Sequence, residues 1–154
     1  MGLPNIFVYT HDSVALGEDG PTHQPIEHIV TLRSTPNLNN WRPADLVETA
    51  VAWKNAVCSK ITPTCLIFSR QGTSAIGRTQ EQISAIEMGG YLLKEKKDND
   101  ITIVASGSEV QLALDAAKEL ENKSINENVV SMPSLDIFLQ QSSEYQKMVI
   151  DPHK

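Results

Sequence analysis

The segment Thr64-Cys65-Leu66-Ile67-Phe68 is a continuous apolar run, typical of a central strand in a parallel sheet whose two faces are both covered. Upstream of it, Asp45-x-x-Glu48 is typical of a helix start, because the Asp side chain caps free amides and the Glu side chain reaches back. Apolar residues from Ala50 to Val57 continue this pattern at helical spacing. The sequence therefore predicts a helix that leads into a buried strand.

Two further strands and one further helix are expected closer to the start of the chain. Residues 5–9 and 38–41 are short runs bounded by proline or polar residues, and both predict strands. Between them, Pro21 suits the first turn of a helix that would end before Pro36. The resulting order of strand, helix, strand, helix and strand predicts a wound α/β unit with right-handed crossovers.

A second unit is expected after residues 71–86, which lose this periodicity and read as an interdomain linker. Residues 101–105 predict a strand, Gly107-Ser108-Glu109 opens a helix, Val129-Val130 marks another strand, and Pro133-Ser134 leads into a last helix. Each of the two units has too few strands for a whole doubly wound sheet, because even three strands with two helices form only its edge. We therefore predict an α/β fold with two incomplete wound, mainly parallel sheet units, divided into residues 1–75, a linker at 76–88, and residues 89–154.

The composition limits the classes of partner. The 154 residues carry a net charge of −6, and the chain has no basic stripe with interleaved aromatic residues, so no nucleic acid is expected as a partner. No apolar run reaches the about 18 residues that a membrane span needs, so no membrane is expected either. Cys58 and Cys65 lie in apolar stretches, which favours buried free thiols of a cytoplasmic protein. No set of side chains has the spacing of metal ligands.

The densest polar cluster follows the first predicted strand: Thr10-His11-Asp12-Ser13, then Gly17-Glu18-Asp19-Gly20-Pro21-Thr22-His23-Gln24. Open α/β sheets bind ligands at the carboxyl ends of their strands, and a helix beginning near Pro21 would also point amides toward this loop. His11 and His23 can titrate near neutral pH, and Asp19 can accept a hydroxyl hydrogen bond. Arg70 follows the run at 64–68, and its guanidinium suits a phosphate group.

These residues predict a site for a small phosphorylated and hydroxylated substrate. A structural alternative stays open, because a histidine at a strand end is often only a hydrogen-bonding residue and Gly17–Gly20 could be a tight turn. His28 lies one helical turn beyond His23, where packing in the core is the expected role.

The same blocks resemble the transketolase family. The stretch from Thr10 to Pro25 is similar to the signature of that family's pyrimidine-binding domain. The resemblance continues in collinear order through Arg33, Pro36-Asn37, Trp41-Arg42-Pro43-Ala44-Asp45, Glu48-Thr49 and Ser69-Arg70-Gln71. Three later blocks resemble the opening of the family's C-terminal domain: Gly89-Gly90-Tyr91, Ala105-Ser106-Gly107-Ser108-Glu109-Val110 and Val130-Ser131-Met132-Pro133-Ser134.

The resemblance implies a transferase, dependent on thiamine diphosphate and Mg²⁺, that moves a two-carbon ketol unit from a ketose phosphate to an aldose phosphate in the pentose phosphate pathway. Carried over by position, His11 and Arg70 would bind the sugar phosphate. Asp19 would bond a hydroxyl beside the reacting carbon, and His23 would bind the donor and act as the catalytic residue in proton transfer.

The family's cofactor-binding residues have no match in this chain. These are the Glu that activates the aminopyrimidine, the aromatic residues that stack on it, and the Gly-Asp-Gly motif that holds diphosphate and Mg²⁺. No residue here is therefore predicted to bind cofactor or metal, and the chain alone is expected to be inactive. The alternatives are another thiamine-dependent enzyme, such as dihydroxyacetone synthase or deoxyxylulose-phosphate synthase, or a non-catalytic protein that binds a full-length subunit, since transketolases are homodimers.

Overall fold

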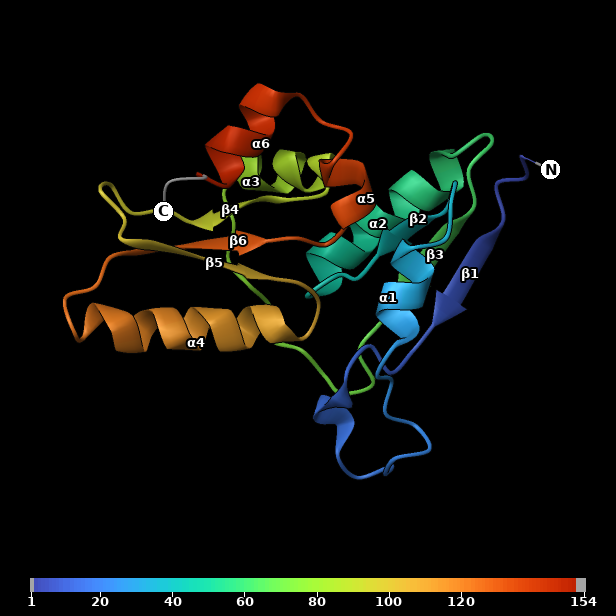
Figure 1. Cartoon of the computed structure of the whole chain (residues 1–154), viewed down its shortest axis with the longest axis horizontal. Helices are drawn as coiled ribbons and strands as arrows, with labels where there is room; N and C mark the ends of the chain where they lie inside the picture. Colours follow the sequence, from blue (N-terminus) through green and yellow to red (C-terminus); the bar gives the residue numbers. More distant parts are fainter. Residues whose placement is uncertain (1, 152–154) are drawn as a thin grey trace.

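The computed structural model of the chain describes residues 2–151 and places them in two α/β units (Figure 1). The first sheet contains β1 (Ile6–Tyr9), β2 (Asn39–Trp41) and β3 (Thr64–Ile67) in the order β1-β3-β2, and both pairings are parallel. Leu66 of the central strand lies between Val8 and Trp41 in the register, and all four residues of β3 are buried. The prediction of a central strand at this position is confirmed.

Helix α2 (Leu46–Cys58) begins as its sequence predicts. The Asp45 side chain accepts hydrogen bonds from the amides of Val47 and Glu48, both at 3.1 Å. Glu48 does reach back, but its carboxylate accepts from the amide of Ala44, at 2.7 Å, one residue before the cap. Cys58, expected to be buried, is exposed at the end of this helix.

The segment after β1 differs from the prediction. It holds a short 3-10 helix, η1 (Val14–Leu16), and α1 (His28–Arg33), which begins seven residues later than the helix predicted from Pro21. Residues 21–27 form turns and bends instead, and none of the residues of α1 is buried. Because α1 packs few side chains, nothing favours extending it toward Pro21.

The segment between the two units, predicted as a linker, contains two short helices. It contains α3 (Gln80–Ala85) followed by a 3-10 helix, η2 (Ile86–Met88). A capping box starts α3: the Gln82 amide donates to the Thr79 side chain at 3.3 Å, and the Thr79 amide donates to the Gln82 side chain at 3.0 Å. This pairing satisfies amides that are otherwise left free at a helix start.

The second sheet has the strand order β4-β6-β5 and a mixed direction. It consists of β4 (Tyr91–Lys94), β5 (Ile101–Ala105) and β6 (Glu127–Ser131); β5 is parallel to β6, whereas β4 is antiparallel to it. Helix α4 (Glu109–Glu121) packs on β5 and β6. Two shorter helices follow, α5 (Leu135–Phe138) and α6 (Ser143–Val149), of which only the first is predicted from the sequence. The α/β fold with two mainly parallel, three-stranded sheets is confirmed.

The two units share one hydrophobic core. Its buried cluster contains Trp41 and Leu66 of the first unit together with Tyr91 and Val110 of the second. Both units bury apolar surface against each other, which is the dominant favourable term in folding. The chain therefore folds around an interface as well as around two sheets.

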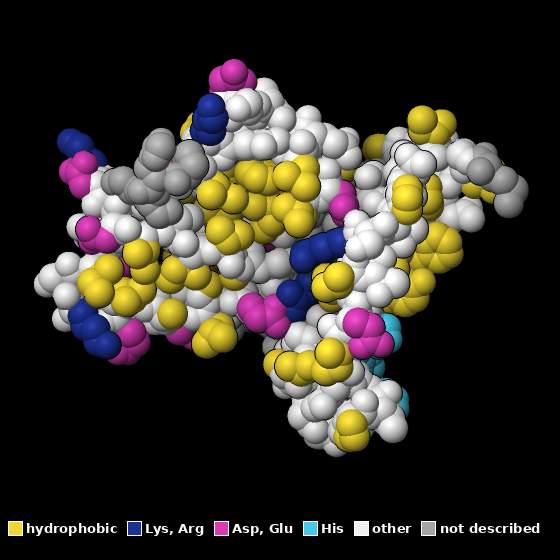
Figure 2. All heavy atoms as spheres, viewed as in Figure 1, with side chains coloured by type: hydrophobic (Ala, Val, Ile, Leu, Met, Phe, Trp, Pro, Cys, Tyr) yellow, Lys and Arg dark blue, Asp and Glu magenta, His cyan; other side chains and the backbone are white. Residues whose placement is uncertain are grey.

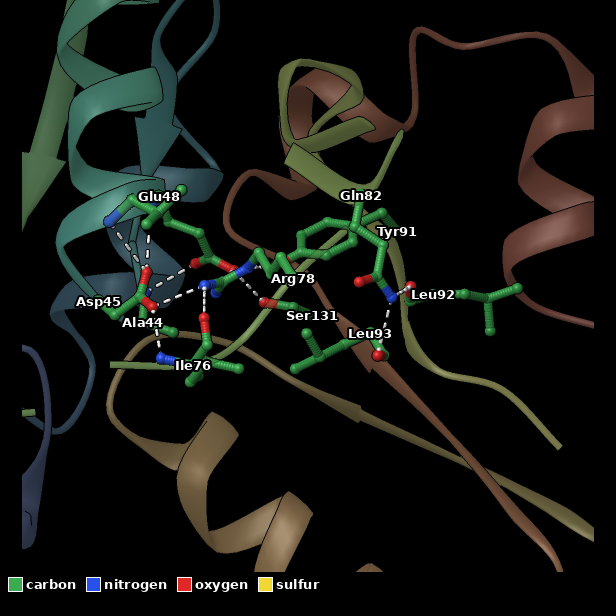
Figure 3. A network of polar contacts seen from close by, with 11 residues as sticks. Ala44, Asp45, Glu48, Ile76, Arg78, Gln82, Tyr91, Leu92, Leu93 and Ser131 are labelled. Carbon is green, nitrogen blue, oxygen red and sulfur yellow. Dashed lines mark hydrogen bonds and ion pairs between the residues drawn. The ribbon is translucent and has the colours of Figure 1, made fainter. Parts of the chain in front are cut away.

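A buried polar network crosses the same interface (Figure 3). The guanidinium of Arg78 donates to Asp45 at 2.6 Å, to Glu48 at 3.2 Å and to the Tyr91 hydroxyl at 2.6 Å. Glu48 also accepts from Tyr91, at 2.7 Å, and from the hydroxyl of Ser131, at 2.6 Å. Residues of α2, of the connecting segment and of the second sheet therefore meet around one buried cation.

The strand at the edge of the first sheet presents apolar side chains to solvent. Phe7, Val8 and Tyr9 are 41%, 50% and 44% exposed, and β1 pairs only with β3. Figure 2 shows apolar atoms gathered on the side of the molecule where β1 runs. An exposed apolar edge strand is a ready surface for pairing with another chain. Among residues 2–151, no helix is long and apolar enough to cross a membrane.

Candidate functional site

The candidate site lies where β1 and β3 end. Thr10 and His11 follow β1 directly, and Arg70 follows β3 after Phe68 and Ser69. These two strands are parallel neighbours, so the residues that follow them emerge at one edge of the sheet. This topology explains why side chains about 60 residues apart in sequence share a site.

His11 is the centre of the site. Its Nε2 lies 3.3 Å from Oδ2 of Asp19, and its Nδ1 lies 2.8 Å from the hydroxyl oxygen of Thr10. The contact with a carboxylate favours the tautomer in which Nε2 carries the proton, and Nδ1 then accepts from Thr10. The ring of His23 lies next to it, with ring centroids 5.5 Å apart. The backbone of His11 has a φ angle of 69°, in the left-handed region.

Asp19 also connects His11 to Arg70. The Nε of Arg70 lies 3.6 Å from Oδ2 of Asp19, and one of its terminal nitrogens lies 3.8 Å from Oε1 of Glu18. Both separations exceed the roughly 2.7–3.2 Å of a good N–H···O hydrogen bond. The Arg70 side chain is 48% exposed. Its guanidinium is therefore attracted by two carboxylates but stays available to an incoming anion.

Two glycines fold the loop so that Asp19 and His23 return toward His11. Gly17 and Gly20 have φ angles of 67° and 71°, which glycine adopts without the steric cost that a side chain brings. The Gly20 amide donates to the Gly17 carbonyl at 3.3 Å, and the His23 amide donates to the Gly20 carbonyl at 3.1 Å. These turns replace the helix start that the sequence predicts near Pro21, so no helical amides point into the loop.

A cavity of about 600 Å³ opens beside the two histidine rings. Its walls include His11, His23, Gln24, His28 and Ile67. Asp19 and Arg70 do not line it; Asp19 contacts the wall at His11, and Arg70 lies beside Asp19. His28, expected in the core, is exposed and faces this cavity because α1 lies at the surface.

The structure thus brings all four predicted site residues together, in the contact order His23, His11, Asp19 and Arg70. It also shows one charged residue that the sequence analysis left without a role. Asp12 is buried, and its carboxylate lies 2.9 Å from Arg42 and accepts from Ser108 of the second unit. Its position beside His11 was the only local signal, because Ser108 lies 96 residues further along the chain.

Within residues 2–151, no group of three or more His, Cys, Asp or Glu side chains could hold a metal ion. The site does provide one guanidinium, that of Arg70, and several hydrogen-bonding groups for a phosphate ester.

Two family models match the chain. Residues 1–74 match the transketolase pyrimidine-binding domain, and residues 89–154 match the transketolase-like C-terminal domain. Transketolase 2 of Vibrio parahaemolyticus is 52% identical over 151 residues, which are 97% of this chain and 23% of that protein. The chain thus spans about a quarter of the length of the curated relatives it matches.

Solved structures of transketolases are also similar to this chain. A transketolase from Pichia stipitis in complex with sedoheptulose 7-phosphate superposes with a TM-score of 0.89 and 48% identity, over 96% of this chain and 22% of the other. A split-gene transketolase, described as an inactive beta4 tetramer, superposes with a TM-score of 0.64 and 32% identity, over 84% of this chain and 39% of the other.

Proposed function

Because this chain belongs to the transketolase family, we propose that it forms the sugar-phosphate side of a ketol-transfer site. The reaction would move a two-carbon ketol unit from a ketose phosphate to an aldose phosphate, as in the pentose phosphate pathway. The observation that carries the proposal is the contact series His23, His11, Asp19 and Arg70 at the carboxyl ends of β1 and β3. The relative from Pichia stipitis in complex with a seven-carbon sugar phosphate supports it.

Each side chain has a role that suits its chemistry. Arg70 and His11 bind the phosphate, and a phosphate dianion competes well with carboxylates that lie 3.6 and 3.8 Å from Arg70. Asp19, which can only accept hydrogen bonds when ionised, binds a hydroxyl of the sugar. Nδ1 of His23 lies 2.9 Å from the Thr22 hydroxyl oxygen, which leaves Nε2 to exchange a proton with the donor sugar.

Thiamine diphosphate and Mg²⁺ are, in this proposal, bound by other parts of the assembly. When bound, the cofactor supplies the carbon nucleophile for the ketose carbonyl. A polypeptide of these 154 residues is then inactive alone and works beside the remaining segments of a transketolase, with residues 1–75 and 89–154 as its two domains and 76–88 as their linker. The exposed apolar edge of β1 supports such an association, and the free thiols support a cytoplasmic location.

The test is a chimera in which this chain replaces the aligned segment of Vibrio parahaemolyticus transketolase 2. We expect the chimera to make sedoheptulose 7-phosphate from xylulose 5-phosphate and ribose 5-phosphate, and the 154-residue chain alone to make none. Arg70→Ala should raise KM for xylulose 5-phosphate by about 10- to 100-fold, the value of a charged hydrogen bond. KM for xylulose, which has no phosphate, is the matched control and should stay unchanged.

His23→Ala in the same chimera should lower kcat by about 100-fold or more, because it removes a proton-transfer group. A chimera in which Arg70→Ala affects both sugars equally, or affects neither, would contradict the phosphate-binding role. Product formed by the 154-residue chain alone would contradict the proposal that other segments bind the cofactor and Mg²⁺.

A further inference from the structure

We propose that Asp12 is a positioning residue for the sugar-phosphate site, and that it holds His11 through a clamp made of Asp12, Arg42 and Ser108. This inference rests on the proposed function and adds to it a role for the second unit. Arg42 follows β2 in the first unit, whereas Ser108 lies at the start of α4 in the second. The second unit would therefore shape a site whose predicted substrate-binding residues all belong to the first.

The clamp consists of several short polar contacts between almost fully buried side chains. Oδ2 of Asp12 accepts from the backbone amide of Ser108 at 3.1 Å and from its hydroxyl at 2.9 Å. It also lies 2.9 Å from a guanidinium nitrogen of Arg42. The side chains of Asp12 and Arg42 are only 1% and 12% exposed. A buried carboxylate with three charge-assisted or backbone contacts is held far more rigidly than one at the surface.

Arg42 is itself anchored to the second unit. Its guanidinium donates to the carbonyl of Ser106 at 2.9 Å and forms an ion pair with Glu109. Its backbone amide donates to the carbonyl of Pro133 at 2.7 Å. The clamp thus connects the loop after β1 to two separate segments of the second unit.

His11 needs such support because of its backbone. A φ of 69° is uncommon for a residue with a side chain, and it persists only where neighbouring contacts hold it. Asp12 is the next residue, so its fixed carboxylate limits how the His11 backbone can rotate. This backbone conformation places the ring between Asp19 and His23. Release of Asp12 would let the ring leave both partners.

The second unit leaves room for the clamp only because residue 107 is a glycine. A Cβ at Gly107 would lie 2.7 Å from Oδ2 of Asp12 and 2.7 Å from Cγ of Arg42. Its φ of 61° also disfavours any side chain. A methyl group at this position would push on the clamp from the second unit without altering any residue of the site.

A plain structural contact between the units is the alternative, and the chain offers a matched control for it. The network of Arg78, Tyr91 and Glu48 joins the same two units and shares no residue with the clamp. Tyr91→Phe removes its bridging hydroxyl. If the clamp only joins the units, then Tyr91→Phe and the clamp variants should have the same effect on the site.

The first measurement uses the 154-residue chain and needs no activity. The rings of His11 and His23 are close enough for nuclear Overhauser effects between their ring protons. We expect Asp12→Ala and Gly107→Ala to weaken these signals at least threefold, and Tyr91→Phe to leave them unchanged while it lowers Tm. If Asp12→Ala does not fold, the same ring signals are measured in Gly107→Ala and in the isosteric variant Asp12→Asn, and these two variants test the proposal. Unchanged ring signals in folded clamp variants would overturn the proposal.

The second measurement uses the chimera. Clamp variants should raise KM for xylulose 5-phosphate about tenfold and leave KM for xylulose unchanged, whereas Tyr91→Phe should change neither. A rise of similar size in Tyr91→Phe would overturn the positioning role in favour of a general structural one. Failure of Arg70→Ala to affect the phosphorylated sugar would instead refute the proposed function, and the ring signals would still report on the clamp.

Discussion

Arg78 is a buried charged residue whose neighbours stabilise its charge. Burial disfavours the charged form, but hydrogen bonds to Asp45 and Tyr91 outweigh it, so the pKa of the guanidinium is raised above its ordinary value. The side chain is 1% exposed and faces two carboxylates that are equally buried. A buried ion pair contributes little relative to a well-packed apolar group, but removal of one partner leaves the other charge uncompensated.

Replacement of this cation should therefore destabilise the chain strongly. We expect Arg78→Met to lower the free energy of unfolding by about 3–5 kcal/mol, because Asp45 and Glu48 would remain buried without a counter-charge. Urea unfolding followed by circular dichroism would measure the change. Lys54→Ala, which breaks an ion pair with Glu87 at the surface, is the control and should hardly shift the midpoint. Similar midpoints for both variants would contradict the argument.

The two cysteines should differ in reactivity. Burial, followed by the negative charge of Asp136, raises the pKa of the Cys65 thiol to about 11. At pH 8 this thiol stays protonated and inaccessible, whereas Cys58 is exposed. We expect Ellman's reagent to modify one thiol per native chain and two in denaturant. Cys58→Ser should give none in the native state, and a native Cys58→Ser chain that reacts readily would refute the assignment.

At the scale of single elements, the capping box before α3 makes a defined contribution to stability. Thr79→Ala removes the side chain that accepts from the Gln82 amide, and we expect a loss of about 1 kcal/mol in the free energy of unfolding. Ser84→Ala in the same helix is the control, since the Ser84 hydroxyl only donates to the carbonyl of Gln80 within the helix. Equal stabilities of the two variants would show that the box does not matter.

Sequence patterns predicted the elements that depend on local chemistry. The strands at 64–68 and 101–105 and the Asp45 cap were recognisable because an apolar run or a capping residue acts over a few positions. The start of helix α1 was predicted too early in the sequence. Pro21 permits a helix, but a helix of only six residues depends on packing for its stability. The capping box of Thr79 and Gln82 was present in the sequence but was read as linker.

The candidate site was predictable for a similar reason, and its surroundings were not. His11, Asp19 and His23 lie in one loop, and the order of strands brings Arg70 to the same edge. Their roles stay predictions. The partners of Asp12 and Glu48 lie in the second unit, and no local pattern specifies which distant side chain satisfies a buried carboxylate.

At the scale of the whole molecule, one core and two polar networks join the units, so we expect the chain to unfold in a single cooperative step. In a Trp53→Phe chain, Trp41 is the only tryptophan; it is fully buried in the shared cluster and its fluorescence reports on the interface, whereas far-ultraviolet circular dichroism reports on both sheets. The two signals should give the same urea midpoint. A fluorescence transition clearly earlier than the loss of secondary structure would show that the units separate before they unfold.

The location of Arg78 also limits how a gene for this protein could be divided. A break in the coding sequence anywhere from residue 49 to residue 77 would put Glu48 and its buried cation on separate polypeptides. Each product would then carry an unbalanced charge toward its own interior. Such halves would have to meet before either could finish folding, and their synthesis would need to be matched in time and amount.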